Sequence, residues 1–130
     1  MPSIFSKIIA GEIPCHKIYE DDQHLAFLDV SPLVMGHVLC VPKSEIDYLF
    51  DMSEDQLKEL WAFTLPVAKA IKKAVPCKRV GTSVIGLEVP HAHIHLVPMN
   101  SADDLNFTRT KLQPSQSDLA EIAAKIIAHI

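Results

Sequence analysis

The chain has 130 residues, of which 48% are hydrophobic and 22% charged, so a single globular domain spanning residues 1–130 is expected. The formal net charge of −4 argues against a nucleic-acid polymer as partner, because phosphate backbones attract basic surfaces. Three widely spaced cysteines indicate free thiols in a cytoplasmic protein, and the sequence has no apolar run long enough to predict a membrane span.

The first third of the chain predicts one short helix and three strands. Ser3 is suited to cap a helix that ends at Ile9 or Ala10, and Gly11 is suited to close it. The following apolar and β-branched runs predict strands over residues 16–21, 24–30 and 37–42.

A long helix is predicted to begin at Ser53, which forms a capping-box pattern with Gln56. Pro66 falls inside this helix, so a kink or a break is expected there, and the helix should end before Pro76. Its apolar residues recur at helical spacing and predict a buried stripe of Leu57, Leu60, Trp61, Thr64, Ala68 and Ile71.

The last third predicts two strands, over residues 79–89 and 91–98, then an irregular loop over 99–116 and a helix from Ser117. The apolar face of this helix would consist of Leu119, Ile122, Ala123, Ile126, Ile127 and Ile130. Five short strands with tight connections predict an α+β fold, in which a five-stranded antiparallel sheet carries helices on one side.

The segment from His91 to Pro98, HAHIHLVP, places three histidines at alternate positions of a predicted strand. Alternate residues of a strand point to the same face, so the three imidazoles should form a row. Three interpretations follow: unrelated surface histidines, a metal site with a third ligand elsewhere, or a phosphoryl- or nucleotidyl-transfer site with a covalent histidine. The spacing alone does not choose between the last two.

The same segment resembles the pattern of the histidine triad (HIT) family, in which three histidines alternate with apolar residues. The segments SIFSKIIAGEIP, HLAFLDVSP and GHVLCVPKSEI are also similar to that family, so the resemblance runs from about Ser3 to Met99. It implies a HIT-like fold and a homodimer whose two sheets join. It also implies binding of a purine nucleotide and cleavage at its α-phosphate without a cofactor.

The resemblance assigns catalytic roles to four histidines. His93 would be the nucleophile that takes up the nucleotidyl group, and His95 would contact the phosphate and donate a proton to the leaving group. His91 and His37 would belong to the hydrogen-bond network that fixes the tautomer of His93.

The resemblance also assigns a nucleotide-binding site. Asp29 would hold the ribose hydroxyls, and Gly86 with the backbone of Glu88 and Val89 would approach the phosphate. The remaining expected contacts are Phe5, Ile8, Phe27 and Val30 around the base, with Leu28 in the same nucleoside-binding strand. From the residues alone, packing in the core explains the base contacts equally well, and a turn explains Asp29 equally well.

Two departures from the family pattern stand out. Ser3, Ser6 and Glu45 occupy positions where many bacterial relatives have zinc ligands, so a metal is not expected. Glu88 occupies a position where relatives often carry serine, and its carboxylate would repel a phosphate. Glu88 therefore either turns away from the substrate or faces a basic group on it.

The function expected from the resemblance is a hydrolase or nucleotidyl transferase acting on phosphorus–nitrogen or phosphoanhydride bonds. Candidate substrates are adenosine phosphoramidates, aminoacyl-adenylates and dinucleoside polyphosphates. The alternative is a non-catalytic module that senses or binds nucleotides, and a metal-dependent hydrolase is a third possibility.

Overall fold

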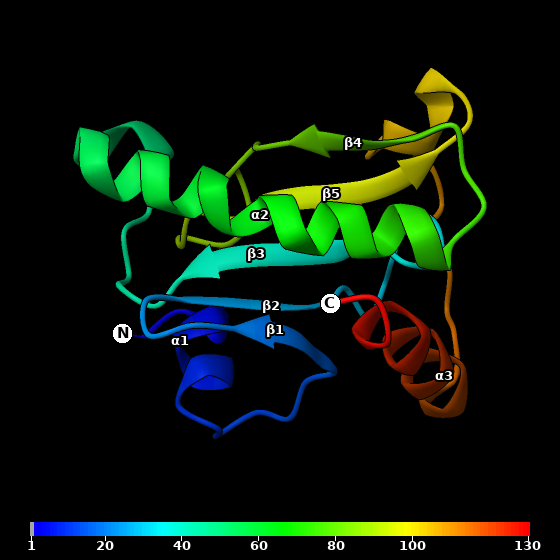
Figure 1. Ribbon diagram of the computed structural model, residues 1–130. Helices are drawn as coiled ribbons and strands as arrows, with labels where there is room; N and C mark the ends of the chain where they lie inside the picture. Colours follow the sequence, from blue (N-terminus) through cyan, green and yellow to red (C-terminus); the bar gives the residue numbers. More distant parts are fainter. Residues whose placement is uncertain (1) are drawn as a thin grey trace.

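Five strands form one antiparallel sheet in the order β1-β2-β3-β5-β4 (Figure 1). The computed structural model describes residues 2–130. The strands are β1 (Lys17–Glu20), β2 (His24–Leu28), β3 (Val38–Pro42), β4 (Arg79–Ser83) and β5 (Ile94–Met99). The antiparallel α+β fold predicted from the sequence is confirmed.

Side-chain caps define where the helices begin. The helices are α1 (Ile4–Ile9), α2 (Glu54–Ala74) and α3 (Gln116–Ile127), with short 3-10 turns at Leu49–Asp51 and Ala102–Leu105. Ser3 caps α1 by accepting the Ser6 amide, and Ser53 and Gln56 form the predicted capping box of α2. Gly11 follows α1 with a φ of +81°, a conformation that favours glycine. None of the helices among residues 2–130 is sufficiently long and apolar to span a membrane.

The sheet is covered on both faces, and the prediction of helices on one side was therefore wrong. The main core packs α2 and α3 against one face, with Leu28 of β2 and Ile94 of β5 among its members. The other face carries a smaller core, in which Phe5 of α1 packs on Phe27 of β2. In Figure 1, α2 crosses in front of β3 and β5, whereas α1 lies near β1 and β2. Both cores depend on the two-residue alternation of the strands.

Helix α2 is continuous through Pro66, so the expected break is absent. Proline removes the bond that its amide would make to the carbonyl of Ala62, but Ala62 is exposed to solvent. The hydroxyl of Thr64 donates to the carbonyl of Trp61 at 2.6 Å, which satisfies a neighbouring acceptor. The loss of one bond on the solvent side is therefore compatible with a continuous helix.

The buried stripe of α2 is rotated from the predicted one. Its buried residues are Leu60, Phe63, Thr64, Val67, Ala70 and Ile71. Trp61 was placed in the stripe, but it is 38% exposed. The predicted apolar face of α3 is also too wide, because Ile127 and Ile130 are each 46% exposed. Periodicity predicted both helices correctly, but it misplaced the buried stripe of α2 and overestimated the width of the buried face of α3.

Candidate active site

The three histidines are close together but do not all lie on the strand. β5 begins at Ile94, so only His95 belongs to it, and His91 and His93 lie in the extended segment that leads into it. The Phe5 ring lies 5.9 Å from the His91 ring and 4.9 Å from the His93 ring, and the His93 and His95 rings are 4.8 Å apart. The three rings therefore share the face of the sheet that α1 covers, as the alternation predicted.

Hydrogen bonds fix the tautomer of His91. Its Nε2 lies 2.8 Å from the carbonyl oxygen of Pro42, which can only accept, so Nε2 carries the proton. Its Nδ1 is then an acceptor, and the Ser3 hydroxyl donates to it at 2.8 Å. His91 is fully buried and has both ring nitrogens occupied, so its role is to hold the segment in place.

His93 carries an accessible lone pair. Its Nδ1 donates to the carbonyl of His91 at 2.7 Å, which leaves Nε2 unprotonated in the neutral ring. No buried side-chain nitrogen or oxygen among residues 2–130 lacks a hydrogen-bond partner, and no partner is found there for this Nε2. The nitrogen therefore reaches solvent, as a nucleophile must.

His95 presents an N–H beside the lone pair of His93. The amide of Leu33 donates to Nδ1 of His37 at 3.1 Å, so His37 carries its proton on Nε2. That Nε2 lies 2.9 Å from Nδ1 of His95 and donates to it. His95 must then hold its own proton on Nε2. The site thus places a lone pair on His93 beside a donor on His95.

Burial keeps these imidazoles neutral. It lowers the pKa of His95 to about 3 and that of His37 to about 4, and the positive charge of Lys111 acts in the same direction on both. The pKa of His93 is also lowered, mainly by burial. Neutral imidazole is the nucleophilic form, so His93 is ready to react at neutral pH.

The residues expected around the base divide between the two faces of the sheet. Phe5 and Phe27 are buried with ring centroids 5.5 Å apart, and Ile8 packs on the same smaller core. Leu28, in contrast, belongs to the main core on the opposite face, so its side chain does not line the site. Val30 lies beyond the end of β2 and is 55% exposed.

Asp29 lies beside the histidine pair. Its Oδ2 is 3.7 Å from Nε2 of His37, and its Oδ1 accepts the amide of Ser31 at 2.9 Å. Burial raises the pKa of Asp29, and the Ser31 amide and the charge of Lys111 oppose that change. Asp29 is therefore the predicted turn residue, and its carboxylate lies at the edge of the site.

The segment before the histidines adopts an open turn. Gly86 has a φ of +73°, and a Cβ there would meet nothing within 4 Å, so its backbone conformation is what requires glycine. Glu88 is exposed, and its charge acts to raise the pKa of His93. Val89 is half-buried against the smaller core, and its carbonyl accepts the amide of His91 at 2.8 Å.

The residues at the family's zinc positions form a hydrogen-bonded cluster that does not fit a metal. The hydroxyl of Ser6 donates to Oε1 of Glu45 at 2.7 Å, and the backbone amide of Ser3 donates to the same oxygen. Nδ1 of His91 is occupied by the Ser3 hydroxyl. Serine hydroxyls are poor zinc ligands compared with thiolates, and here they already have partners.

A second group of possible ligand atoms is formed by Asp29, His37 and His95, which lie within 4.8 Å of one another. It contains one of the three triad histidines rather than the two that the metal interpretation predicted. The nearest ring nitrogens of His37 and His95 are already hydrogen-bonded to each other. These contacts favour a proton-holding pair over a metal-binding one.

Several residues at the site were not predicted from the sequence. The ring of Phe107 lies 4.6 Å from that of His95 and 6.2 Å from that of His37. Lys111 donates to the carbonyl of Phe107 at 3.1 Å, and Leu33 binds His37. Phe107 and Lys111 lie in the region predicted to be an irregular loop. The only available signal was their position on a loop after a functional strand.

One cavity is lined by none of the four site histidines. Its volume is about 410 Å³, and its lining includes Tyr48, Phe50, Trp61 and Ile85. Ala92 also lines it, and Ala92 packs in the main core on the face opposite to the imidazoles. Gly86, which was predicted to approach the phosphate, also lines the cavity, so the cavity adjoins the turn before the histidines but not the imidazoles.

Comparisons with known proteins identify the family of the chain. The model of the HIT domain matches residues 10–102. An uncharacterized HIT-like protein of Borreliella burgdorferi is 36% identical, over 98% of this chain and 97% of its own. An adenosine 5′-monophosphoramidase of Schizosaccharomyces pombe is 32% identical, over 75% and 74%. The crystal structure of a Hit-like protein from Bartonella henselae has a TM-score of 0.85 and 31% identity, over 98% and 96%.

Proposed function

Because the chain belongs to the HIT family, we propose that it is a hydrolase that cleaves the phosphorus–nitrogen bond of adenosine phosphoramidates through a nucleotidyl-histidine. The observation that carries the proposal is the arrangement of tautomers, with a lone pair at Nε2 of His93 beside an N–H at Nε2 of His95. The fission yeast relative named as an adenosine 5′-monophosphoramidase supports the choice of bond.

In the first step, Nε2 of His93 forms a bond to the α-phosphorus. The bond from phosphorus to the leaving nitrogen breaks, and that nitrogen keeps the electron pair and takes a proton from the His37–His95 pair. The pair is neutral in the free protein, so it takes up this proton from water as the anionic substrate binds, because the negative charge of the phosphate favours the protonated form of the pair. Water then attacks phosphorus, breaks its bond to His93 and returns a proton to the pair. Two easier steps thus replace one difficult step.

The proposed nucleotide site uses Phe5, Ile8 and Phe27 for the base and Asp29 for the ribose hydroxyls. All four lie on or beside the imidazole face. Val30 at the rim, and Gly86, Glu88 and Val89 before the histidines, complete the proposed site. Glu88 is exposed, and its negative charge acts on His93, so it is available to a basic leaving group bound there.

The decisive experiment is to trap the covalent intermediate. Rapid quenching of the wild-type protein with adenosine phosphoramidate should give a mass increase of one adenylyl group, located on His93. His93→Ala should lose both adduct and turnover, and His95→Ala should lower the rate of adduct formation by roughly 10²-fold or more. Turnover that persists in His93→Ala would contradict the covalent mechanism. Tight AMP binding without any turnover would favour the nucleotide-sensing alternative.

We also propose that the protein is a cytoplasmic homodimer. Cys15, Cys40 and Cys77 are all free thiols, which suits a reducing compartment. Strand β4 lies at the end of the sheet, with one edge unpaired among residues 2–130. Unpaired edges are templates for a further strand, so a second copy could extend the sheet there.

A further inference from the structure

Residues 100–112 form a strap that follows β5 and is attached to the loop between β2 and β3. Arg109 donates to the carbonyl of Leu33 at 2.7 Å, and the amide of Leu112 donates to the carbonyl of Pro32 at 2.9 Å. The strap thereby binds the carbonyl groups of Pro32 and Leu33, which lie on either side of the Leu33 α-carbon. The Leu33 contact spans 76 residues of sequence and is partly buried.

The loop between β2 and β3, to which the strap binds, also contacts the His37–His95 pair. The carbonyl of Pro32 and the amide of Leu33 belong to the same peptide group, and that amide donates to Nδ1 of His37. A continuous chain of hydrogen bonds therefore runs from the strap, through this peptide group and His37, to Nδ1 of His95. Hydrogen bonds in such a chain polarise and strengthen one another.

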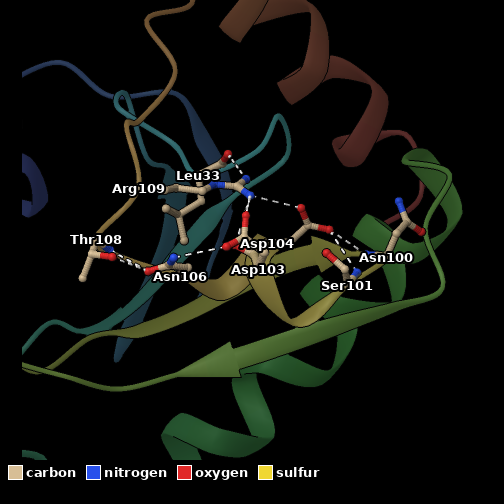
Figure 2. A network of polar contacts seen from close by, with 8 residues as sticks. All are labelled: Leu33, Asn100, Ser101, Asp103, Asp104, Asn106, Thr108 and Arg109. Atoms are coloured by element: carbon tan, nitrogen blue, oxygen red, sulfur yellow. Dashed lines mark hydrogen bonds and ion pairs between the residues drawn. The ribbon is translucent and has the colours of Figure 1, made fainter.

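Arg109 is itself held by the strap, as Figure 2 shows. Its Nη1 donates to the carbonyl of Asp103 at 3.0 Å and lies 3.2 Å from the carboxylate of Asp103 and 3.3 Å from that of Asp104. Asp104 in turn accepts the backbone amides of Asn100 and Ser101. These contacts leave Nη2 of Arg109 free of the carboxylates, and it is Nη2 that donates to the carbonyl of Leu33.

The strap also contacts the histidines directly. Phe107 lies two residues before Arg109 and packs edge-on against His95 at 4.6 Å. Because the same segment carries Arg109 and Phe107, displacement of the guanidinium would loosen both the Leu33 peptide groups and the ring that covers His95. Both changes would alter the orientation of the His95 imidazole.

We infer that Arg109 is a positioning residue, which fixes the His37–His95 pair through Leu33 and so keeps an N–H at Nε2 of His95 for the leaving group. The inference rests on the proposed function. It predicts that loss of Arg109 slows only those substrates whose leaving group needs a proton. A purely structural role would slow all substrates alike.

The test compares Arg109→Ala with the wild type in single-turnover formation of the adenylyl adduct. With adenosine phosphoramidate, the rate should fall about tenfold or more. With the nitrophenyl ester of AMP, whose leaving group departs without a proton, the rate should change by less than about threefold. Arg109→Lys should recover part of the loss, and Arg79→Ala, which removes an exposed arginine at the start of β4, serves as the control.

An independent measurement uses the imidazole nitrogens. Correlation of ring ¹⁵N and ¹H signals should show the Nε2–H tautomer for His37 and His95 in the wild type and a mixture of tautomers in Arg109→Ala. Unchanged tautomers, or equal slowing of both substrates, would overturn the inference. If Arg109→Ala does not fold by circular dichroism, the same criteria apply to Arg109→Lys. Absence of any adduct in the wild type would reject the proposed function, while the tautomer measurement would still test Arg109.

Discussion

His93 carries its proton on Nδ1, whereas His37, His91 and His95 carry theirs on Nε2, because the hydrogen-bond partners of the rings differ. His93 faces a carbonyl at Nδ1, whereas His95 faces an N–H at the same ring position. Two residues of the same type, two positions apart, thereby present a lone pair and an N–H, as the proposed nucleophile and proton donor require. The assignment depends on neighbouring backbone groups, since the partner of His93 is the carbonyl of His91 and the partner of His37 is the amide of Leu33.

The lowered pKa values of His37 and His95 predict that acid destabilises the protein. Their folded pKa values, about 4 and about 3, lie below the ordinary value of 6.5, so the unfolded chain binds more protons below pH 6.5. Stability should be fully present above pH 6.5 and decline as the pH falls below it. We expect the free energy of unfolding to drop by at least about 2 kcal/mol between pH 7 and pH 4.5.

Urea denaturation at a series of pH values measures this decline, and His95→Gln provides the comparison. The variant should show a shallower dependence on pH, because one of the two imidazoles whose pKa is lowered to about 4 or about 3 is gone. The same slope in both proteins would show that other groups cause the decline.

Sequence periodicity predicted the helices and strands well, but it predicted less well which face of each element is buried. Ser3, Ser53 and the alternating histidines each gave a local signal that the structure confirms. Phe27 and Leu28 are neighbours on β2, so they had to face opposite sides, and this rule could have removed Leu28 from the predicted site. The attachment of Arg109 to Leu33 has no local signal, because it joins two irregular segments far apart in the sequence.

The hydrogen bonds of Ser3 and Ser6 with His91 and Glu45 predict the zinc content of the purified protein. Ser3 and Ser6 of the N-terminal segment bind Glu45 and His91 through hydrogen bonds, where thiolates and a second imidazole would be needed for zinc. Elemental analysis of the purified protein should therefore find well under one zinc ion per chain. A stoichiometric, tightly held zinc ion would contradict this assignment of the cluster.

At the scale of the whole molecule, exposed apolar residues identify the surface proposed for the second copy. Tyr48, Phe50, Trp61 and Ile85 are 59%, 68%, 38% and 45% exposed, and all four line the cavity of about 410 Å³. Ile85 follows β4, whose outer edge is unpaired among residues 2–130. Contiguous apolar surface of this kind is typical of protein–protein contacts.

Light scattering after size-exclusion chromatography tests the dimer directly. The wild type should have twice the chain mass of 14.4 kDa, and Trp61→Glu should shift the equilibrium to the monomer. Ile127→Glu, at an apolar residue of similar exposure on α3, should leave the mass unchanged. A wild-type protein that is monomeric at high concentration would show that the apolar surface has another purpose.

The strap and the triad histidines occupy separate segments of the chain. The matched HIT domain ends at residue 102, and Phe107, Arg109 and Lys111 all follow it. The atom that would bond to phosphorus belongs to the segment of the triad histidines, while the groups proposed to orient the proton donor belong to the strap. An engineer could therefore change which compounds are processed by redesigning a short surface loop, with the reacting imidazole left untouched.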